Sequence, residues 1–201
     1  MIDAALTSAV RLFTGVRARW LECPVESPRS RIYFANHTSH LDFVVLWSVL
    51  PPAARRRTRP AAARDYWSRG RLRPWLAAHV FRAALIEREH VTRTNNPVDQ
   101  LAAVLAAGDS VILFPEGTRG SGPEMGDFKS GLYHLAKRQP EAELVPAYIE
   151  NLNRVLPKGE VLAVPLICHV TFGPPERLGA GESKEDFLTR MRVAVVRLRG
   201  I

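Results

Sequence analysis

A histidine and an aspartate five residues apart are the side chains of this sequence best suited to acid–base chemistry. His37 and Asp42 lie between an apolar run at residues 32–35 and a second apolar run that begins at Phe43. The first run is typical of a buried strand. Ser39 followed three residues later by Asp42 is typical of a helix start. The imidazole and the carboxylate are therefore expected to face each other across a strand-to-helix turn, at hydrogen-bonding distance. Such a histidine can act as a general base, although Asp42 could also serve only as the helix cap.

A glycine-rich loop follows a second strand pattern, at residues 110–114. After Pro115 it reads Glu116-Gly117-Thr118-Arg119-Gly120-Ser121-Gly122. Glycines let backbone N–H groups approach an anion closely, and Arg119 can bind a phosphate through two hydrogen bonds. Glu116 would stand at the mouth of the loop and accept a hydrogen bond from a substrate hydroxyl. The loop could equally be a turn closed by a Glu116–Arg119 salt bridge, and it lacks the Lys-Ser/Thr ending of a nucleotide P-loop.

The remaining patterns predict the scaffold that brings the two loops together. Helical and strand patterns alternate along the chain, with strands expected at 32–35, 83–86, 110–114, 145–149 and 166–172, and helices at 2–21, 40–50, 71–82, 97–107, 130–138 and 183–198. This order predicts an α/β fold with a mainly parallel or mixed central sheet flanked by helices on both faces. If the strands before the two loops are parallel, both loops emerge at the carboxyl edge of the sheet, where such folds bind ligands.

Composition narrows the class of protein. The chain has 201 residues, which suits a single domain, and its hydrophobic content of 46% argues against disorder. Its 28 Lys and Arg against 20 Asp and Glu give a net charge of +8, which favours an anionic partner unless the excess only solvates the surface. Cys23 and Cys168 lack metal-type spacing, so a reducing cytosol is the expected compartment.

The first 25 residues are expected to form an amphipathic helix with possible membrane contact, followed by one domain over residues 26–201. Apolar residues recur at helical spacing through residues 2–21, with arginines between them, as in helices that lie at a bilayer interface. Packing of this helix on the protein's own core is the alternative. No apolar stretch is long enough for a transmembrane helix, and no secretory signal pattern is evident.

Four arginines at residues 55–59 form the densest charge cluster. The cluster could bind lipid headgroups, a phosphorylated carrier or nucleic acid, or it could be a solvated loop. Lys129, just before the helix expected at 130–138, could add a further positive charge, with a surface position as the alternative.

Two stretches carry a family resemblance. Residues 36–42, Asn-His-Thr-Ser-His-Leu-Asp, resemble the N-H-x-x-x-x-D block of the glycerolipid acyltransferases, the family typified by 1-acylglycerol-3-phosphate acyltransferase. Residues 114–120, Phe-Pro-Glu-Gly-Thr-Arg-Gly, match that family's F-P-E-G-T-R-S block except at the last place. Their separation, about eighty residues, is also that of the family, and the likeness spans roughly residues 30–150.

Two weaker blocks complete the resemblance. Val145-Pro146 is similar to the fourth block of the family. The second block, G-x-x-F-I-x-R, is only partly kept: Ile86 and Arg88 match, whereas Arg82 stands for the glycine and Leu85 for the aromatic residue. Because the resemblance implies that this block helps to hold the acceptor, the acceptor's identity stays open.

The resemblance implies an O-acyltransferase that moves a fatty acyl group from acyl-CoA or acyl-carrier protein to a hydroxyl of a lysophospholipid such as 1-acylglycerol-3-phosphate. His37 would remove the hydroxyl proton while Asp42 fixes the imidazole tautomer, with no covalent acyl-enzyme, metal or cofactor. The residues implied to bind the acceptor are Glu116, Gly117, Thr118, Arg119 and Arg88. The expected location is cytoplasmic, at the inner face of an anionic membrane.

Three alternatives remain open. The first is an acyltransferase of the same family with another lysophospholipid or a non-glycerolipid acceptor. The second is a basic nucleic-acid-binding protein that uses residues 55–59, although the sequence holds no recognised nucleic-acid-binding motif. The third is a metal hydrolase that uses His37, His40 and Asp42.

Overall fold

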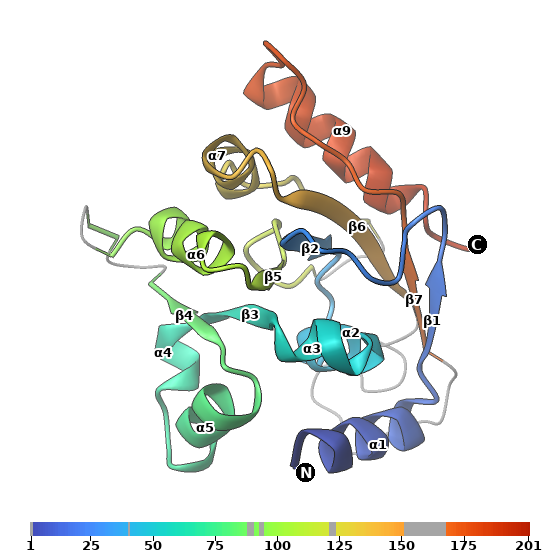
Figure 1. Ribbon diagram of the computed structural model, residues 1–201, viewed down its shortest axis with the longest axis vertical. Coiled ribbons are helices and arrows are strands. Elements are labelled where there is room, and N and C mark those ends of the chain that lie inside the picture. Colours follow the sequence, from blue (N-terminus) through green and yellow to red (C-terminus); the bar gives the residue numbers. More distant parts are fainter. Residues whose placement is uncertain (1, 40, 88–90, 93–94, 121–123, 151–167) are drawn as a thin grey trace.

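A seven-stranded mixed sheet forms the centre of the protein (Figure 1). The computed structural model describes residues 2–39, 41–87, 91–92, 95–120, 124–150 and 168–201. The strands, in sequence order, are β1 (Arg17–Trp20), β2 (Arg31–Ala35), β3 (Thr58–Ala63), β4 (Ala84–Ile86), β5 (Ser110–Leu113), β6 (Glu143–Glu150) and β7 (His169–Phe172). In space their order is β1-β7-β6-β2-β5-β3-β4, and every neighbouring pair is parallel except β6 and β7. The predicted α/β fold with a mixed sheet is confirmed.

Helices cover both faces of this sheet. They are α1 (Ile2–Thr14), α2 (Asp42–Val49), α3 (Pro52–Arg56), α4 (Arg64–Trp67), α5 (Leu72–Trp75), the short π-helix η1 (Leu76–Val80), α6 (Pro97–Ala106), α7 (Gly131–Arg138) and α9 (Lys184–Val196). Within the described ranges, no helix is both long and apolar enough to cross a bilayer.

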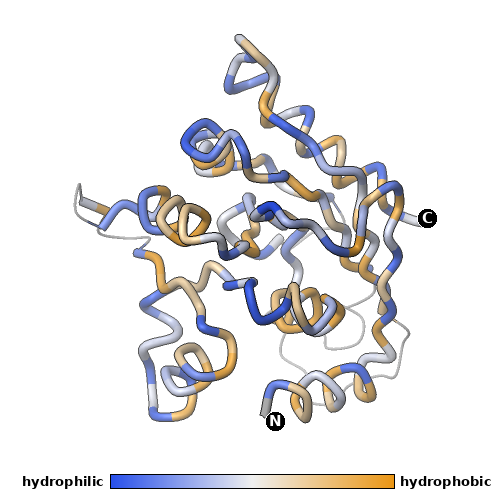
Figure 2. Tube along the Cα trace, viewed as in Figure 1, coloured by the Kyte–Doolittle hydropathy of each residue, from blue (hydrophilic) through white to orange (hydrophobic). Residues whose placement is uncertain are grey.

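The central strand β2 separates two hydrophobic cores. Its side chains alternate: Tyr33 and Ala35 belong to a core closed by α1, α2 and η1, and Ile32 and Phe34 to a core closed by α6, α7 and α9. Because both faces are covered, β2 is apolar almost throughout and fully buried. Helix α2 is likewise almost wholly hydrophobic, as its colour in Figure 2 shows.

The N-terminal helix is shorter than predicted. Helix α1 ends at Thr14, where Gly15 adopts a φ of +58°, and a glycine with positive φ commonly ends a helix. Residues 17–20, which were expected to continue the helix, form strand β1 beside β7. Trp20 stacks on Phe172 with ring centroids 4.0 Å apart, so this tryptophan packs within the protein.

The sequence left open whether the arginine cluster at residues 55–59 is a solvated loop. In the structure, three of its arginines contact the protein itself. Arg55 is buried against the Trp47 ring at 5.2 Å and donates to backbone carbonyls at the end of α2. Arg57 donates to the Gly108 carbonyl at 2.6 Å, and Arg59 to the Asp109 carboxylate, also at 2.6 Å.

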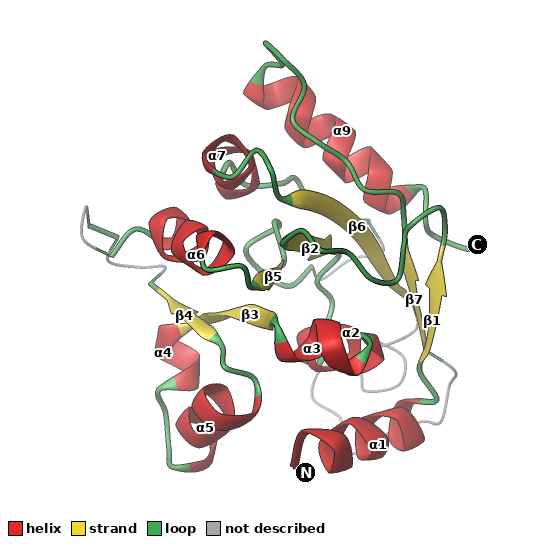
Figure 3. Cartoon of the chain, in the orientation of Figure 1, coloured by secondary structure: helices red, strands yellow, loops and turns green. Residues whose placement is uncertain are grey.

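Strand β3 starts within this cluster and was not predicted (Figure 3). Pro60 and three following alanines argue against a central strand. However, Thr58 to Pro60 pair with β5, whereas Ala61 to Ala63 pair with β4. The proline therefore lies where the strand passes from one neighbour to the next, and tertiary pairing overrides its poor propensity.

The other predicted elements agree with the structure to within a few residues. The segment predicted as a helix at 71–82 is divided between α5 and η1. His40, at the predicted start of the helix at 40–50, and residues 166–167 of the last predicted strand lie outside the described residues.

Candidate active site

His37 and Asp42 meet at the carboxyl end of β2. His37 lies in the loop after this strand, and Asp42 is the first residue of α2. The distance from His37 Nδ1 to Asp42 Oδ2 is 2.8 Å, so the predicted hydrogen bond is present. The Asp42 side chain is fully buried, whereas that of His37 is 22% exposed. A buried carboxylate thus holds one side of the imidazole while the ring remains accessible.

Asp42 also orders the turn that precedes it. Its Oδ2 accepts hydrogen bonds from the backbone N–H groups of Thr38, at 2.6 Å, and Ser39, at 2.8 Å. The bond to Ser39 is the helix-start contact expected from the sequence, so the cap and the histidine partner are the same oxygen. With Nδ1–H donated to Asp42, Nε2 is the ring nitrogen that has a lone pair for a substrate proton.

Phe114 packs against one face of the His37 ring. The residue follows β5, the parallel neighbour of β2, and its ring stacks on the imidazole with centroids 4.4 Å apart and planes 18° from parallel. The apolar ring excludes water from one imidazole face. The sequence identified Phe114 as part of a motif but gave no signal for this contact.

From the sequence, Glu116 was expected to stand at the mouth of its loop. In the structure, its carboxylate is instead directed toward backbone N–H groups. Its side chain is buried, and each carboxylate oxygen accepts a backbone hydrogen bond: Oε1 from His37 N at 2.8 Å and Oε2 from Gly126 N at 2.9 Å. The Gly120 N–H donates to the His37 carbonyl at 2.9 Å in return. Glu116 therefore joins the two loops through the backbone of the histidine, because the two strands end side by side.

The other predicted loop residues line a groove that His37 also lines. Gly117 has a φ of +74°, so a residue with a side chain would be strained there, and a built Cβ would lie in ordinary contact with Lys129, 3.4 Å from its Cγ. Thr118 and Arg119 line the same groove, with the Arg119 side chain exposed. Arg88 lies outside the described residues, and its expected contact with the acceptor remains a prediction.

Lys129 was left undecided by the sequence and contributes to the groove. Its side chain is exposed and lies on the groove wall together with Arg119 and His37. Two exposed cations therefore line the same groove as the histidine, which suits the binding of an anionic group.

The groove has a volume of about 810 Å³ and is mainly apolar, within the usual range for small-molecule sites. Away from the cations, its walls come from both cores. The lining residues of the first core are Leu6, Val10, Phe43 and Trp67. Those of the second core include Val98, Leu101 and Leu135. A long aliphatic chain could lie along these walls with its polar end at His37.

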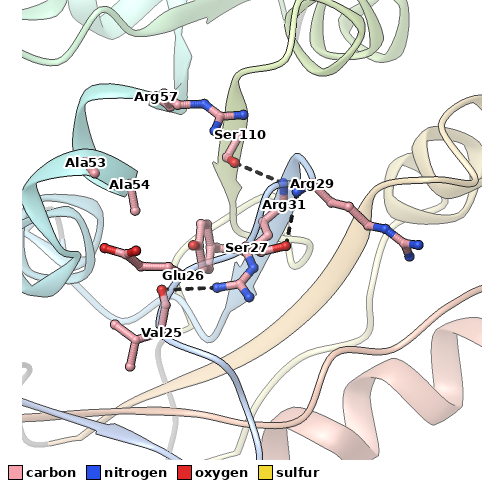
Figure 4. A pocket seen from close by; sticks show the side chains of 10 residues that line it. Val25, Glu26, Ser27, Arg29, Arg31, Ala53, Ala54, Arg57 and Ser110 are labelled. Atoms are coloured by element: carbon pink, nitrogen blue, oxygen red, sulfur yellow. Dashed lines mark hydrogen bonds between the residues drawn. The ribbon is translucent and has the colours of Figure 1, made fainter.

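A smaller hollow of about 150 Å³ lies at the opposite edge of the sheet (Figure 4). It surrounds Arg31, which starts β2, and Ser110, which starts β5. The Ser110 hydroxyl accepts from Arg31 N at 2.9 Å, and Arg31 Nε donates to Glu143 at 2.8 Å. The predicted site residues are absent from its described lining, so the groove at His37 is the candidate active site.

Neither cysteine is placed to act as a nucleophile. Burial raises the pKa of the Cys168 thiol to about 12, and burial likewise raises the pKa of Cys23. Both are fully or nearly fully buried, and Cys168 Sγ lies 3.0 Å from the Glu150 carbonyl. A thiol with a raised pKa is mainly protonated at neutral pH and reacts slowly.

Comparisons with known proteins show the family of the chain. The family model described as Acyltransferase matches residues 24–150, more than half of the chain and including both loops. The chain belongs to the acyltransferase family. This match confirms the family that the two motifs resemble.

Individual acyltransferases show the extent of the likeness. Human 1-acyl-sn-glycerol-3-phosphate acyltransferase alpha is 31% identical over 147 residues, 72% of this chain and 49% of the relative. Lyso-ornithine lipid O-acyltransferase from Rhizobium meliloti is 29% identical over 129 residues, 62% of this chain and 40% of the relative. The chain thus spans about half the length, or less, of these curated acyltransferases.

A solved acyltransferase structure shares the fold. The crystal structure of the 1-acyl-sn-glycerophosphate acyltransferase PlsC from Thermotoga maritima superposes with a TM-score of 0.75 at 18% identity. The match covers 98% of this chain and 78% of that one.

Proposed function

We propose that this protein is an O-acyltransferase that transfers a fatty acyl group from an acyl thioester to the hydroxyl of a lysophospholipid such as 1-acylglycerol-3-phosphate. The observation that carries this proposal is the His37–Asp42 pair, 2.8 Å apart, beside a mainly apolar groove. The names of the human relative and of PlsC support this acceptor class.

In the proposed reaction His37 acts as the general base. Nε2 removes the proton from the acceptor hydroxyl while Asp42 stabilises the imidazolium that forms. The hydroxyl oxygen attacks the thioester carbonyl, and the C–S bond breaks as the new ester forms. The departing thiolate then takes the proton from His37. The raised thiol pKa values of Cys23 and Cys168 support direct transfer without a covalent acyl-enzyme.

The acceptor phosphate is proposed to bind Arg119 and Lys129, with Arg88 as a further candidate. The Arg119 and Lys129 side chains are exposed, and both line the groove that His37 also lines. The acyl chain would lie along the apolar walls, while acyl-CoA or acyl-carrier protein approaches the same histidine. The protein would work at the inner face of an anionic membrane. No resident metal or cofactor is part of this proposal.

Glu116 is proposed to position His37, because both of its carboxylate oxygens already accept backbone hydrogen bonds. The acceptor contact that the family resemblance implied for Glu116 remains a prediction. The two roles differ in what they do to the kinetics. A positioning residue lowers kcat when altered, whereas an acceptor ligand raises KM.

A second acceptor class is favoured by one relative. Lyso-ornithine lipid O-acyltransferase is named for an acceptor whose head group is an amino acid. The nucleic-acid alternative is not supported by residues 55–59, where Arg55, Arg57 and Arg59 contact the protein itself. The metal alternative needs His40, which lies outside the described residues, and metal analysis of the purified protein would test it.

The experiment is a mass-spectrometric screen of lysophospholipids and lyso-ornithine lipid with mixed acyl-CoA. Wild-type protein is expected to acylate at least one acceptor, whereas His37→Ala is expected to lose about 10²–10⁴-fold in rate. Thermal unfolding of the variant checks that it folds. Undiminished turnover by a folded His37→Ala protein would refute the proposal.

A further inference from the structure

A short arginine-rich segment projects beside the groove and has no part in the reaction described above. It comprises α4, α5 and the turn between them, residues 64–75. Two apolar side chains stand exposed on α5: Leu72 is 67% exposed and Trp75 41%. Such large apolar side chains seldom stand together on a surface without a partner.

The base of this segment is anchored firmly. Trp67 of α4 packs edge-to-face on Phe43, with centroids 5.4 Å apart, and on Phe81, at 6.0 Å. The chain then turns at Gly70, which has a φ of +73° and no neighbouring atom within 4 Å of a built Cβ. Trp67 therefore anchors α4 to the protein, whereas Leu72 and Trp75 beyond the turn are exposed. The Trp75 ring stacks on its neighbour His79, with centroids 5.6 Å apart.

The segment is also strongly basic. It contains four exposed arginines, against one acidic residue, Asp65; they are Arg64, Arg69, Arg71 and Arg73. Three of them also contact the protein. Arg64 donates to the Leu85 carbonyl at 3.3 Å, Arg69 donates to the Asp65 carbonyl at 3.1 Å, and the Arg73 guanidinium lies 4.3 Å from the centroid of the Tyr66 ring. A tryptophan and a leucine surrounded by arginines suit the boundary between lipid headgroups and acyl chains.

The segment shares its end of the molecule with α1. Figures 1 and 2 show α1 and α5 along the lower edge of the view, both with hydrophobic stretches. On α1, Leu12 is 83% and Phe13 70% exposed. The groove is lined by Leu6 and Val10 of α1 and by Tyr66 and Trp67 of α4. Helix α1, which carries one exposed apolar pair, and helix α4, which belongs to the segment that carries the other, therefore both line the groove that His37 also lines.

We propose that the α4–α5 segment is a second membrane contact, which places Leu72 and Trp75 among the acyl chains of an anionic bilayer and the exposed Arg71 at the lipid phosphates. Together with α1 it would hold the groove against the bilayer, so that a lysophospholipid enters directly from the membrane. This inference rests on the proposed function, because it supplies the route of that lipid acceptor.

The test is the binding of the whole protein to vesicles of phosphatidylcholine with phosphatidylglycerol, measured by co-sedimentation. Leu72→Ser/Trp75→Ser is expected to weaken binding about tenfold or more, because two apolar side chains no longer enter the bilayer. Arg71→Ala is expected to weaken it about fivefold on anionic vesicles only. Thermal unfolding should be nearly unchanged, since both apolar side chains are exposed.

The matched control is Val193→Ser/Val196→Ser. These two valines are 37% and 41% exposed. They belong to α9, which Figure 1 shows near the top of the view, away from α1 and α5 at its lower edge. Their replacement should leave vesicle binding unchanged. A second readout is quenching by brominated lipid, which should affect wild-type tryptophan fluorescence and be largely lost in Trp75→Phe.

Activity separates this inference from the proposed function. On a short-chain acceptor that is monodisperse in solution, the Leu72/Trp75 variant should match wild type, and it should be slower only on acceptor embedded in vesicles. Unchanged vesicle binding by the variant, or wild-type protein that binds no vesicles, would overturn the inference. If the variant binds vesicles like wild type but no longer self-associates, the surface is a contact between copies of this chain. Failure of acyl transfer to the monodisperse acceptor would count against the proposed function alone.

Discussion

Two buried carboxylates hold the same histidine, and they hold different parts of it. One oxygen of Asp42 accepts from the imidazole and from two backbone N–H groups. Glu116 instead uses both oxygens on backbone N–H groups, one belonging to His37 and one to Gly126. Asp42 thus contacts the imidazole ring itself, whereas Glu116 contacts the backbone of the same residue. Two acidic residues in two motifs therefore have separable effects.

The largest effect is expected from Asp42→Asn. The amide removes the negative charge that stabilises the imidazolium, and it can hold the wrong tautomer, so kcat should fall about 10²–10⁴-fold. As a helix cap alone, the same change should cost about 1 kcal/mol or less in the free energy of unfolding. Steady-state kinetics and chemical denaturation measure the two effects. A large loss of stability with full activity would leave Asp42 only its cap role.

Glu116→Gln is expected to have a smaller effect, of about tenfold on kcat, with the acceptor KM unchanged. One oxygen can still accept a hydrogen bond, but the amide NH₂ then faces a backbone N–H, which leaves a buried donor unpaired. The free energy of unfolding should fall by about 1–3 kcal/mol for the same reason.

Glu124→Gln is the control for this change, because Glu124 is exposed in the same loop. It should leave both kcat and stability unchanged. A Glu116→Gln protein with a raised acceptor KM and a normal kcat would instead show that Glu116 binds the acceptor, as the family resemblance implied. Glu116 would then not be a positioning residue for His37.

Replacement of the two cations that line the groove, Arg119 and Lys129, tests whether acceptor binding can be separated from the chemistry at His37. Arg119→Ala should raise the KM for a phosphorylated acceptor about tenfold and leave kcat nearly unchanged, because a charged hydrogen bond to the ground state is lost. Lys129→Ala should act in the same direction. With an acceptor that lacks phosphate neither variant should differ from wild type, and an equal effect on both acceptors would remove the phosphate role.

The smallest effect is expected from Cys168. Its pKa of about 12 keeps the buried thiol protonated at pH 7–9, so iodoacetamide should react slowly with the folded protein and leave its activity intact. Cys168→Ala should retain kcat within about twofold, since a buried cysteine behaves as a small apolar residue. Rapid inactivation that the Cys168→Ala variant escapes would point to a covalent route.

The elements set by neighbouring residues could be predicted from the sequence, whereas those set by contacts between distant residues could not. Apolar runs predicted the strands β2, β5 and β6, and apolar residues at helical spacing predicted α6, α7 and α9, because these patterns are recorded in consecutive residues. They missed β1 and β3. Strand β1 follows a helix of similar composition, and β3 contains Pro60, whose cost is relieved only by the way the strand changes neighbours.

The sequence by itself determined the strand–loop–helix order around His37 and Asp42, and hence a hydrogen bond between residues five apart. It also determined the family, through two motifs with the right spacing. Only the tertiary structure decided what Glu116 contacts, because its partners are backbone groups far away in the sequence or in another part of the loop. It also brought Phe114, Arg119 and Lys129 to the histidine. Parallel strands bring their carboxyl ends together whatever the length of chain between them, and no local pattern records which side chains meet there.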